Sequence, residues 1–129
     1  MDNRELFARL IKCEAGGEGE TGMKAVATVV MNRVRVPYGE YQTVNMGDIG
    51  GVPNIQNVCS MTPDEIHYEV ADWALNGGIY TGVGDESLWY MNPFSPICPD
   101  PFPYNGTGYW YTRVTQHCFY NPTARYAQT

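Results

Sequence analysis

A chain of 129 residues is long enough for one domain with a real hydrophobic core, so we expect a single domain over residues 1–129. The formal net charge of -6 argues against a nucleic-acid-binding protein and gives no attraction to anionic membranes or acidic polymers. A neutral or weakly charged substrate fits better, because 10 tyrosines and 3 tryptophans offer stacking and hydrogen bonds. Most of these aromatic side chains are nevertheless expected in the core.

The sequence contains no candidate membrane span and no export signal. No apolar run approaches the roughly twenty residues that a span needs. The N-terminal stretch MDNRELFARLIKCE mixes charged and apolar residues and lacks the apolar centre of a signal peptide. We therefore expect a protein made and used without such export, or one whose leader has been removed.

The cysteine pattern argues against a structural zinc site. None of the 4 cysteines forms the C-x-x-C pair typical of zinc knuckles, and we predict neither a metal nor a cofactor. Either two disulfides or four buried thiols fit the positions Cys13, Cys59, Cys98 and Cys118.

The first half of the chain is predicted to be helical. A first helix is capped by Asp2 or Asn3 and ends at Gly16-Gly17. A second helix opens near Thr21 and reaches Val34, and because it is apolar nearly all round it should be buried. The apolar positions are Leu6, Phe7, Leu10 and Ile11, then Met23, Val26, Ala27, Val29, Val30 and Met31.

A third helix is predicted after a long polar loop, residues 36–59. Loops of this length are often functional. Thr62-Pro63-Asp64-Glu65 has the pattern of a capping box with proline at the first helical position. The helix closes at Asn76-Gly77-Gly78, and its apolar face consists of Ile66, Val70, Trp73 and Ala74.

The second half of the chain is predicted to form a small antiparallel sheet with long loops. Residues rich in aromatic and β-branched side chains predict strands over Ser87–Met91, Tyr109–Arg113 and His117–Tyr120. Prolines and glycines in the intervening FSPICPDPFPYNGTG exclude regular structure there. The chain is thus predicted to have an α+β fold.

Glu14 is the most informative single residue. It ends an amphipathic helix, directly before a glycine-rich break and a long apolar helix. A carboxyl group held against such a helix is partly desolvated, which raises its pKa and suits a general acid for glycosidic-bond cleavage. An ordinary helix end followed by an acidic loop would give the same spacing.

The chain resembles the SleB/CwlJ family of spore-cortex-lytic cell-wall hydrolases, and its CwlJ-type branch in particular. The resemblance is carried by ARLIKCEAGGEGETGM, VVMNRV, SLWYMNP and QHCFYNPTA, together with the ALNG helix end, in the family's order. It implies a lysozyme-like catalytic domain that cleaves the β-1,4 glycan strands of peptidoglycan during spore germination. The family's essential acid, the first glutamate of its EA-x-GE motif, corresponds to Glu14, and the second glutamate to Glu18. For Glu18 the expected role is to organise the loop or to hydrogen-bond substrate or backbone.

The resemblance also favours a reaction type. Two-carboxylate hydrolysis needs a partner about 5–9 Å across the scissile bond, and no second residue stands out. A single acid/base suffices in a lytic transglycosylase, the chemistry that the SleB relatives imply, while plain hydrolysis remains open for the CwlJ branch. The acidic residues that could serve as a second carboxylate beside Glu14 are all expected at the surface: Asp48, Asp64, Glu65, Asp72, Asp85, Glu86 and Asp100.

Substrate contacts are expected from Trp89, Tyr90 and Asn92, which match the family's aromatic-aromatic-x-Asn-Pro segment. Strand alternation places Trp89 on the face opposite Tyr90, so one of the two rings can belong to the core, and we favour Tyr90 near Glu14. His117 matches the family's histidine, although a lone histidine on a strand is more often structural. In the long loop the chain departs from the family, because polar Gln56 and Asn57 stand where a phenylalanine is expected; Asn57 is a weak candidate for substrate binding.

The CwlJ-type resemblance further implies a Cys98–Cys118 disulfide. Cys13 is small and adjacent to Glu14, and we expect it to be buried. It implies synthesis in the mother cell without a signal peptide and a place at the boundary of spore coat and cortex. A spore-coat partner of the GerQ type and activation by calcium dipicolinate are also implied, although no residues for either site are visible.

Two other functions agree with parts of the sequence. A zinc amidase or peptidase would need three ligands, but the chain has only His67 and His117 and no H-E-x-x-H motif. A non-catalytic coat or scaffold protein would fit the altered loop, but the intact EA-x-GE motif argues against it.

Overall fold

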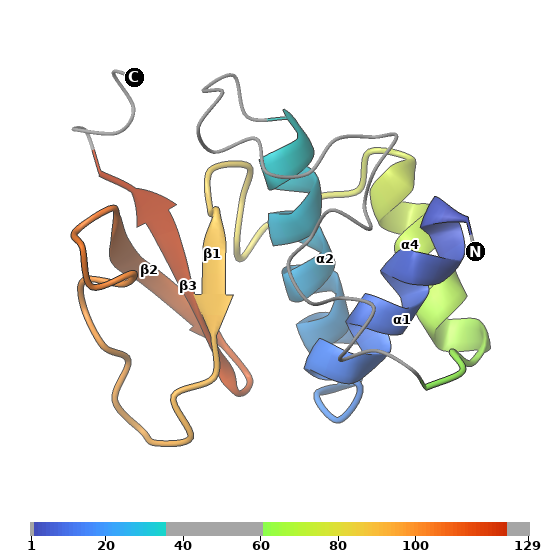
Figure 1. The fold of residues 1–129 in the computed structure, drawn as a ribbon, viewed down its shortest axis with the longest axis horizontal. Helices are drawn as coiled ribbons and strands as arrows, with labels where there is room; N and C mark the ends of the chain where they lie inside the picture. The colour runs from blue at the N-terminus through green and yellow to red at the C-terminus, as the bar shows by residue number, and fades with distance from the viewer. Residues whose placement is uncertain (1, 36–60, 124–129) are drawn as a thin grey trace.

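The computed structural model describes residues 2–35 and 61–123 and has an α+β architecture. Within these residues, three helices pack together, and a three-stranded antiparallel sheet lies beside them (Figure 1). The helices are α1 (Asn3–Ala15), α2 (Gly19–Arg35) and α4 (Glu65–Leu75), and the strands are β1 (Trp89–Met91), β2 (Gly108–Val114) and β3 (His117–Pro122). The predicted fold class is therefore confirmed.

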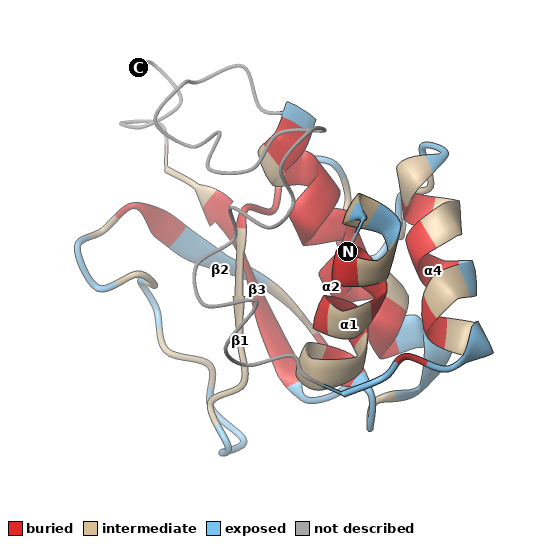
Figure 2. Cartoon of the chain, turned by 45° about the vertical axis from the view of Figure 1, so that its right-hand side comes forward, coloured by how far each residue is buried: buried red, intermediate tan, exposed pale blue. Residues whose placement is uncertain are grey.

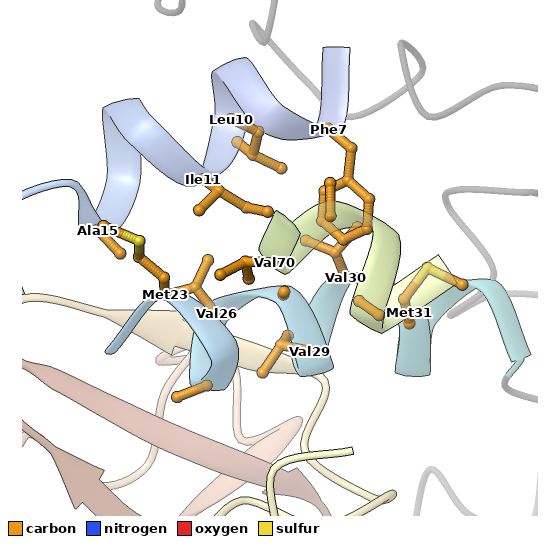
Figure 3. Packing of buried hydrophobic residues seen from close by; sticks show 14 of the residues in the cluster. Phe7, Leu10, Ile11, Ala15, Met23, Val26, Val29, Val30, Met31 and Val70 are labelled. Atoms are coloured by element: carbon orange, nitrogen blue, oxygen red, sulfur yellow. The ribbon is translucent and has the colours of Figure 1, made fainter. Parts of the chain in front are cut away.

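Helix α2 lies at the centre and is buried almost all round, as its composition predicts (Figure 2). Helices α1 and α4 cover one side of it, and the sheet lies on the other (Figure 1). Figure 3 shows how side chains from the three helices interdigitate in this core. Those labelled there are Phe7, Leu10, Ile11, Ala15, Met23, Val26, Val29, Val30, Met31 and Val70.

Three helix ends follow the predicted capping. The Asp2 side chain accepts the Glu5 backbone N–H at 2.8 Å, and Gly16 caps the C-terminus of α1. Helix α4 ends at Asn76 with Gly77 at a φ of +97°, a left-handed backbone that favours glycine.

The predicted start of the third helix is wrong by two residues. The N-cap is Asp64 rather than Thr62, and His67 Nδ1 accepts the Asp64 backbone N–H at 2.9 Å. Lys12 of α1 donates to the Thr62 carbonyl at 2.7 Å, which holds the preceding residues against α1.

The sheet has the order β1-β3-β2, with β3 in the centre. Tyr90 pairs with Phe119, and Val114 pairs with His117 across a two-residue turn formed by Thr115 and Gln116. Successive residues of a strand point to opposite faces. His117 therefore lies on the same face of β3 as the core residue Phe119, and Cys118 lies on the other face.

The far face of the sheet is covered by the segment between β1 and β2, residues 92–107. A Cys98–Cys118 disulfide fixes this segment to the central strand, as the resemblance implies. The Tyr120 hydroxyl donates to the Pro99 carbonyl at 2.6 Å, and the Phe102 ring lies 5.1 Å from that of Tyr120. As predicted, the segment contains neither helix nor strand.

No helix within residues 2–35 or 61–123 is long and apolar enough to cross a membrane.

The disulfide should contribute strongly to stability. It links residues separated by 20 positions, and a closed loop of that length is expected to stabilise the fold by about 3 kcal/mol through the unfolded chain. Denaturant unfolding of the Cys98→Ser/Cys118→Ser variant should show this loss relative to the oxidised wild type. A phosphine reductant should destabilise the wild type similarly and leave the double variant unchanged; equal stability of oxidised and reduced wild type would contradict the assignment.

Candidate active site

Glu14 occupies the last turn of α1, where the chain leaves the helix for the break before α2. Its side chain is partly buried, and this burial raises the pKa of the Glu14 carboxyl above its ordinary value. The charge of His117 acts in the opposite direction, and the negative charge of Glu18 raises the pKa further. A raised pKa keeps a carboxyl protonated toward neutral pH, which is the state that a general acid requires.

Glu18 lies four residues further on and is held differently. Its Oε1 accepts the Thr115 hydroxyl and the Gln116 backbone N–H, the latter at 2.8 Å. Its Oε2 lies 2.6 Å from His117 Nδ1. Burial acts to raise the pKa of Glu18, but the contacts with Thr115, His117 and Gln116 outweigh it and lower the pKa overall.

Gly22, one turn into α2, makes room for the Glu18 side chain. A Cβ at this position would lie 2.5 Å from the Glu18 Cβ and 3.1 Å from the Thr115 hydroxyl oxygen. Real Cβ atoms do not approach so closely, so glycine is required here by packing.

The Glu18 carboxylate therefore joins the helix break to the β2–β3 turn, although the two segments lie 97 residues apart in sequence. Thr115 has a φ of +51°, which is rare for a β-branched residue. Hairpin turns with positive φ usually carry Asn or Gly. The hydrogen bonds that Glu18 accepts from Thr115 and Gln116 stabilise this unusual turn from outside the hairpin.

Tyr90 lies next to His117 on the sheet. Their ring centroids are 5.4 Å apart in an edge-to-face arrangement, and the Tyr90 ring also lies 6.4 Å from that of Phe119. Tyr90 thus lies beside His117, whose Nδ1 is 2.6 Å from Glu18. The proximity of Tyr90 to Glu14 stays a prediction.

Two residues of the VVMNRV block fix the segment that enters β1. The Asn32 amide donates to the carbonyls of Gly84 and Ser87, both at 3.0 Å. Arg33 Nε donates to the Leu88 carbonyl at 2.6 Å, and burial lowers the pKa of the Arg33 guanidinium. These residues position β1, and with it Tyr90, from the C-terminal end of α2.

The remaining predicted residues lie elsewhere. Trp89 is on the face of β1 opposite Tyr90, where its ring fills the space beside Gly108, as strand alternation predicts. The Asn92 side-chain oxygen accepts the Phe94 backbone N–H at 2.8 Å and so shapes the turn after β1. Asn57 lies outside the described residues, as does Cys59.

Sequence reasoning missed Gly22, Thr115, Gln116, Asn32 and Arg33 as parts of this site. A glycine inside an otherwise apolar helix is a signal for close packing, and a two-residue gap between strand patterns is a signal for a hairpin turn. Neither pattern shows which distant side chain completes it.

The described part of the chain offers no obvious metal centre. Within residues 2–35 and 61–123, no three His, Cys, Asp or Glu side chains are grouped so that they could hold a metal ion.

The family profile of the Cell Wall Hydrolase family matches residues 17–120. The chain belongs to this family. Glu18 lies inside the matched range and Glu14 three positions before it. The chain is 33% identical to the cell wall hydrolase CwlJ of Halalkalibacterium halodurans over 93% of this chain and 85% of the relative. It is 30% identical to CwlJ of Bacillus subtilis with the same coverage, which confirms the resemblance to the SleB/CwlJ family.

Two solved structures share the fold. The catalytic domain of the germination-specific lytic transglycosylase SleB from Bacillus anthracis matches with a TM-score of 0.64 at 21% identity, covering 92% of this chain and 93% of that one. The SleB catalytic domain from Bacillus cereus matches with a TM-score of 0.62 at 24% identity, covering 92% and 88%. The fold is therefore lysozyme-like, as the resemblance implies.

Replacing Gly22 by Ala should disrupt the Glu18 contacts. Alanine is the better helix former by about 1 kcal/mol, yet the clash with the Glu18 Cβ should lower the free energy of unfolding by about 1–3 kcal/mol. Denaturant unfolding measures this difference. Gly17→Ala is the matched control, because a Cβ there meets nothing within 4 Å, and a stabilised Gly22→Ala variant would contradict the packing described.

The Glu14 environment predicts a pH-dependent stability difference. Because folding raises the pKa of Glu14, ionising this group costs stability, and the wild type should lose stability as the pH rises from the ordinary pKa through the raised one. Glu14→Gln has no such cost. Melting temperatures should be measured from about pH 4 to about pH 8. The melting temperature of the variant should rise relative to that of the wild type as the pH increases. A difference that is constant with pH would show that folding does not shift the pKa of Glu14.

Proposed function

We propose that this protein cleaves the glycan strands of spore-cortex peptidoglycan as a lytic transglycosylase, with Glu14 as its single acid/base. The observation that carries the proposal is the partly buried Glu14 carboxyl, whose pKa is raised at the junction of helices and sheet. Family membership and the names of the similar proteins, cell wall hydrolase CwlJ and germination-specific lytic transglycosylase SleB, support the substrate class.

The chemistry proceeds in two proton transfers. Protonated Glu14 donates its proton to the glycosidic oxygen, and the bond between that oxygen and C1 of the muramic acid breaks. The Glu14 carboxylate then takes the proton of the C6 hydroxyl of the same sugar as its oxygen bonds to C1. The products are a free hydroxyl on the leaving sugar and a 1,6-anhydro ring, with Glu14 restored to its acid form and no water consumed.

The second carboxylate of the motif does not fit the role of a hydrolytic partner. Glu18 is the carboxylate among the described residues whose charge acts on Glu14, but its oxygens already contact the β2–β3 turn and His117. Other acidic side chains are engaged elsewhere: Asp72 forms a 2.7 Å ion pair with Arg4, and Asp100 accepts the Trp110 backbone N–H. This arrangement favours single-carboxylate chemistry over two-carboxylate hydrolysis.

The setting proposed for this activity follows the CwlJ-type relatives. The protein would act as one catalytic domain at the boundary of spore coat and cortex, after synthesis in the mother cell. A GerQ-type coat protein would be its partner, and calcium dipicolinate would activate it.

Mass spectrometry of fragments from purified spore cortex tests the proposal. Wild-type protein should release fragments with anhydro-muramic ends, which are lighter by one water than hydrolysed ends, and Glu14→Gln should release none. Glu20→Gln is the matched control, since Glu20 is exposed and pairs only at the surface with Lys24 at 3.2 Å. Reducing ends from the wild type would identify a hydrolase instead, and undiminished activity of Glu14→Gln would exclude Glu14 as the acid.

A further inference from the structure

Protein groups take up most of the acceptor positions of the Glu18 carboxylate. It accepts from the Thr115 hydroxyl and the Gln116 backbone N–H and lies 2.6 Å from His117 Nδ1. An ionised carboxylate has about four acceptor positions, so three contacts leave little capacity for a further ligand. The Glu18 side chain is also only 7% exposed, which leaves little of its surface for a sugar to touch.

These contacts connect the segment that carries Glu14 to the sheet. Glu18 follows Glu14 by four residues, across the break between α1 and α2. Its partners belong to the β2–β3 turn and to the first residue of β3. Any displacement of this turn therefore changes the position of His117 relative to the end of α1.

The position of His117 matters because its charge acts on Glu14. A nearby imidazolium favours the carboxylate form of Glu14, and a nearby carboxylate favours the acid form. Within the described structure, the charged groups that influence Glu14 are His117 from β3 and Glu18 from the helix break. His117 and Glu18 contact each other directly. This one contact therefore fixes the positions of both groups and balances their opposite effects on the pKa of Glu14.

We propose that Glu18 is a positioning residue rather than a substrate-binding one: by clamping the β2–β3 turn and His117, it sets the surroundings in which Glu14 transfers its proton. This inference rests on the proposed function of Glu14 and, of the roles expected for Glu18 and His117, favours the structural ones over direct substrate binding. His117 is then a buried neighbour that Glu18 orients, in keeping with its 4% exposure.

Steady-state cleavage kinetics of three variants on soluble cortex glycan test the positioning role. Glu18→Ala should lower kcat by about a hundredfold, the cost typical of a displaced catalytic constellation, and leave KM nearly unchanged. Glu18→Gln should recover much of this loss, because its amide oxygen can still accept from Thr115 and Gln116. Thr115→Val changes no titratable group and keeps a β-branched residue in the turn, and should lower kcat about fivefold, as for one lost hydrogen bond.

Two outcomes would overturn the proposal. A raised KM with unchanged kcat in Glu18→Ala would show that Glu18 binds substrate, and an unchanged kcat in Thr115→Val would show that the turn contact does not matter. Glu20→Gln, on the exposed surface of α2, is the control for loss of a nearby negative charge. If Glu18→Ala does not fold, the Gln and Thr115 variants still decide the question.

A second readout does not depend on cleavage. The Glu14 carboxyl can be titrated by nuclear magnetic resonance in wild type and in His117→Gln. Its midpoint should move to higher pH in the variant, because the charge that lowers it has been removed. An unmoved midpoint would show that His117 is not placed to influence Glu14. A shifted midpoint together with an inactive wild type would instead refute the proposed function and leave the placement of His117 intact.

Discussion

The arrangement of the helices relative to the sheet depends on the contacts of the Glu18 carboxylate with the β2–β3 turn and His117. The helices and the sheet share one hydrophobic core, to which the sheet contributes Val114 and Phe119. Polar contacts at both ends of α2 add to this apolar interface. At its N-terminal end Glu18 holds the β2–β3 turn, and at its C-terminal end Asn32 and Arg33 hold the segment entering β1. Between them Thr28 accepts the Tyr80 backbone N–H at 2.9 Å.

Two glutamates four residues apart acquire opposite properties from this arrangement. The Glu14 carboxyl is partly buried, and its pKa rises. The Glu18 side chain is also buried, but the Thr115 hydroxyl, the Gln116 backbone N–H and the neighbouring His117 outweigh the cost of its charge, and its pKa falls. A site that needs one protonated and one ionised carboxyl at the same pH is usually built by such a difference in surroundings. Here the difference arises because Glu18, beyond the chain break, accepts hydrogen bonds from the β2–β3 turn.

The sequence predicted those features that depend on local patterns. Apolar spacing located the three helices, alternation placed Trp89 and Tyr90 on opposite faces, and proline and glycine content excluded regular structure between β1 and β2. The position of Glu14 before a glycine-rich break also predicted the direction of its pKa shift. These features follow from residues within a few positions of one another.

Features that depend on distant partners could not be predicted in the same way. Nothing near Glu18 in sequence indicates that its partners are Thr115 and Gln116. The start of α4 was misplaced for the same reason, because Lys12 from α1 holds the carbonyl of Thr62 outside the helix. Propensity and capping patterns describe what a segment can do alone, and a contact from another helix decides among the alternatives.

The segment over the far face of the sheet explains how so small a sheet can hold His117 firmly. Among the described residues the sheet has three strands and helices on one side only, so that without a covering segment β3 would expose Cys118 and Tyr120 to solvent. The 92–107 segment covers them through the disulfide to Cys98 and the bond from Tyr120 to Pro99, and both side chains are fully buried. Cys118 follows His117 directly, so the disulfide restrains the strand on one face while Glu18 restrains the histidine on the other. Loss of the disulfide should therefore affect the histidine contact as well as global stability, because the two restraints act on adjacent residues of one strand.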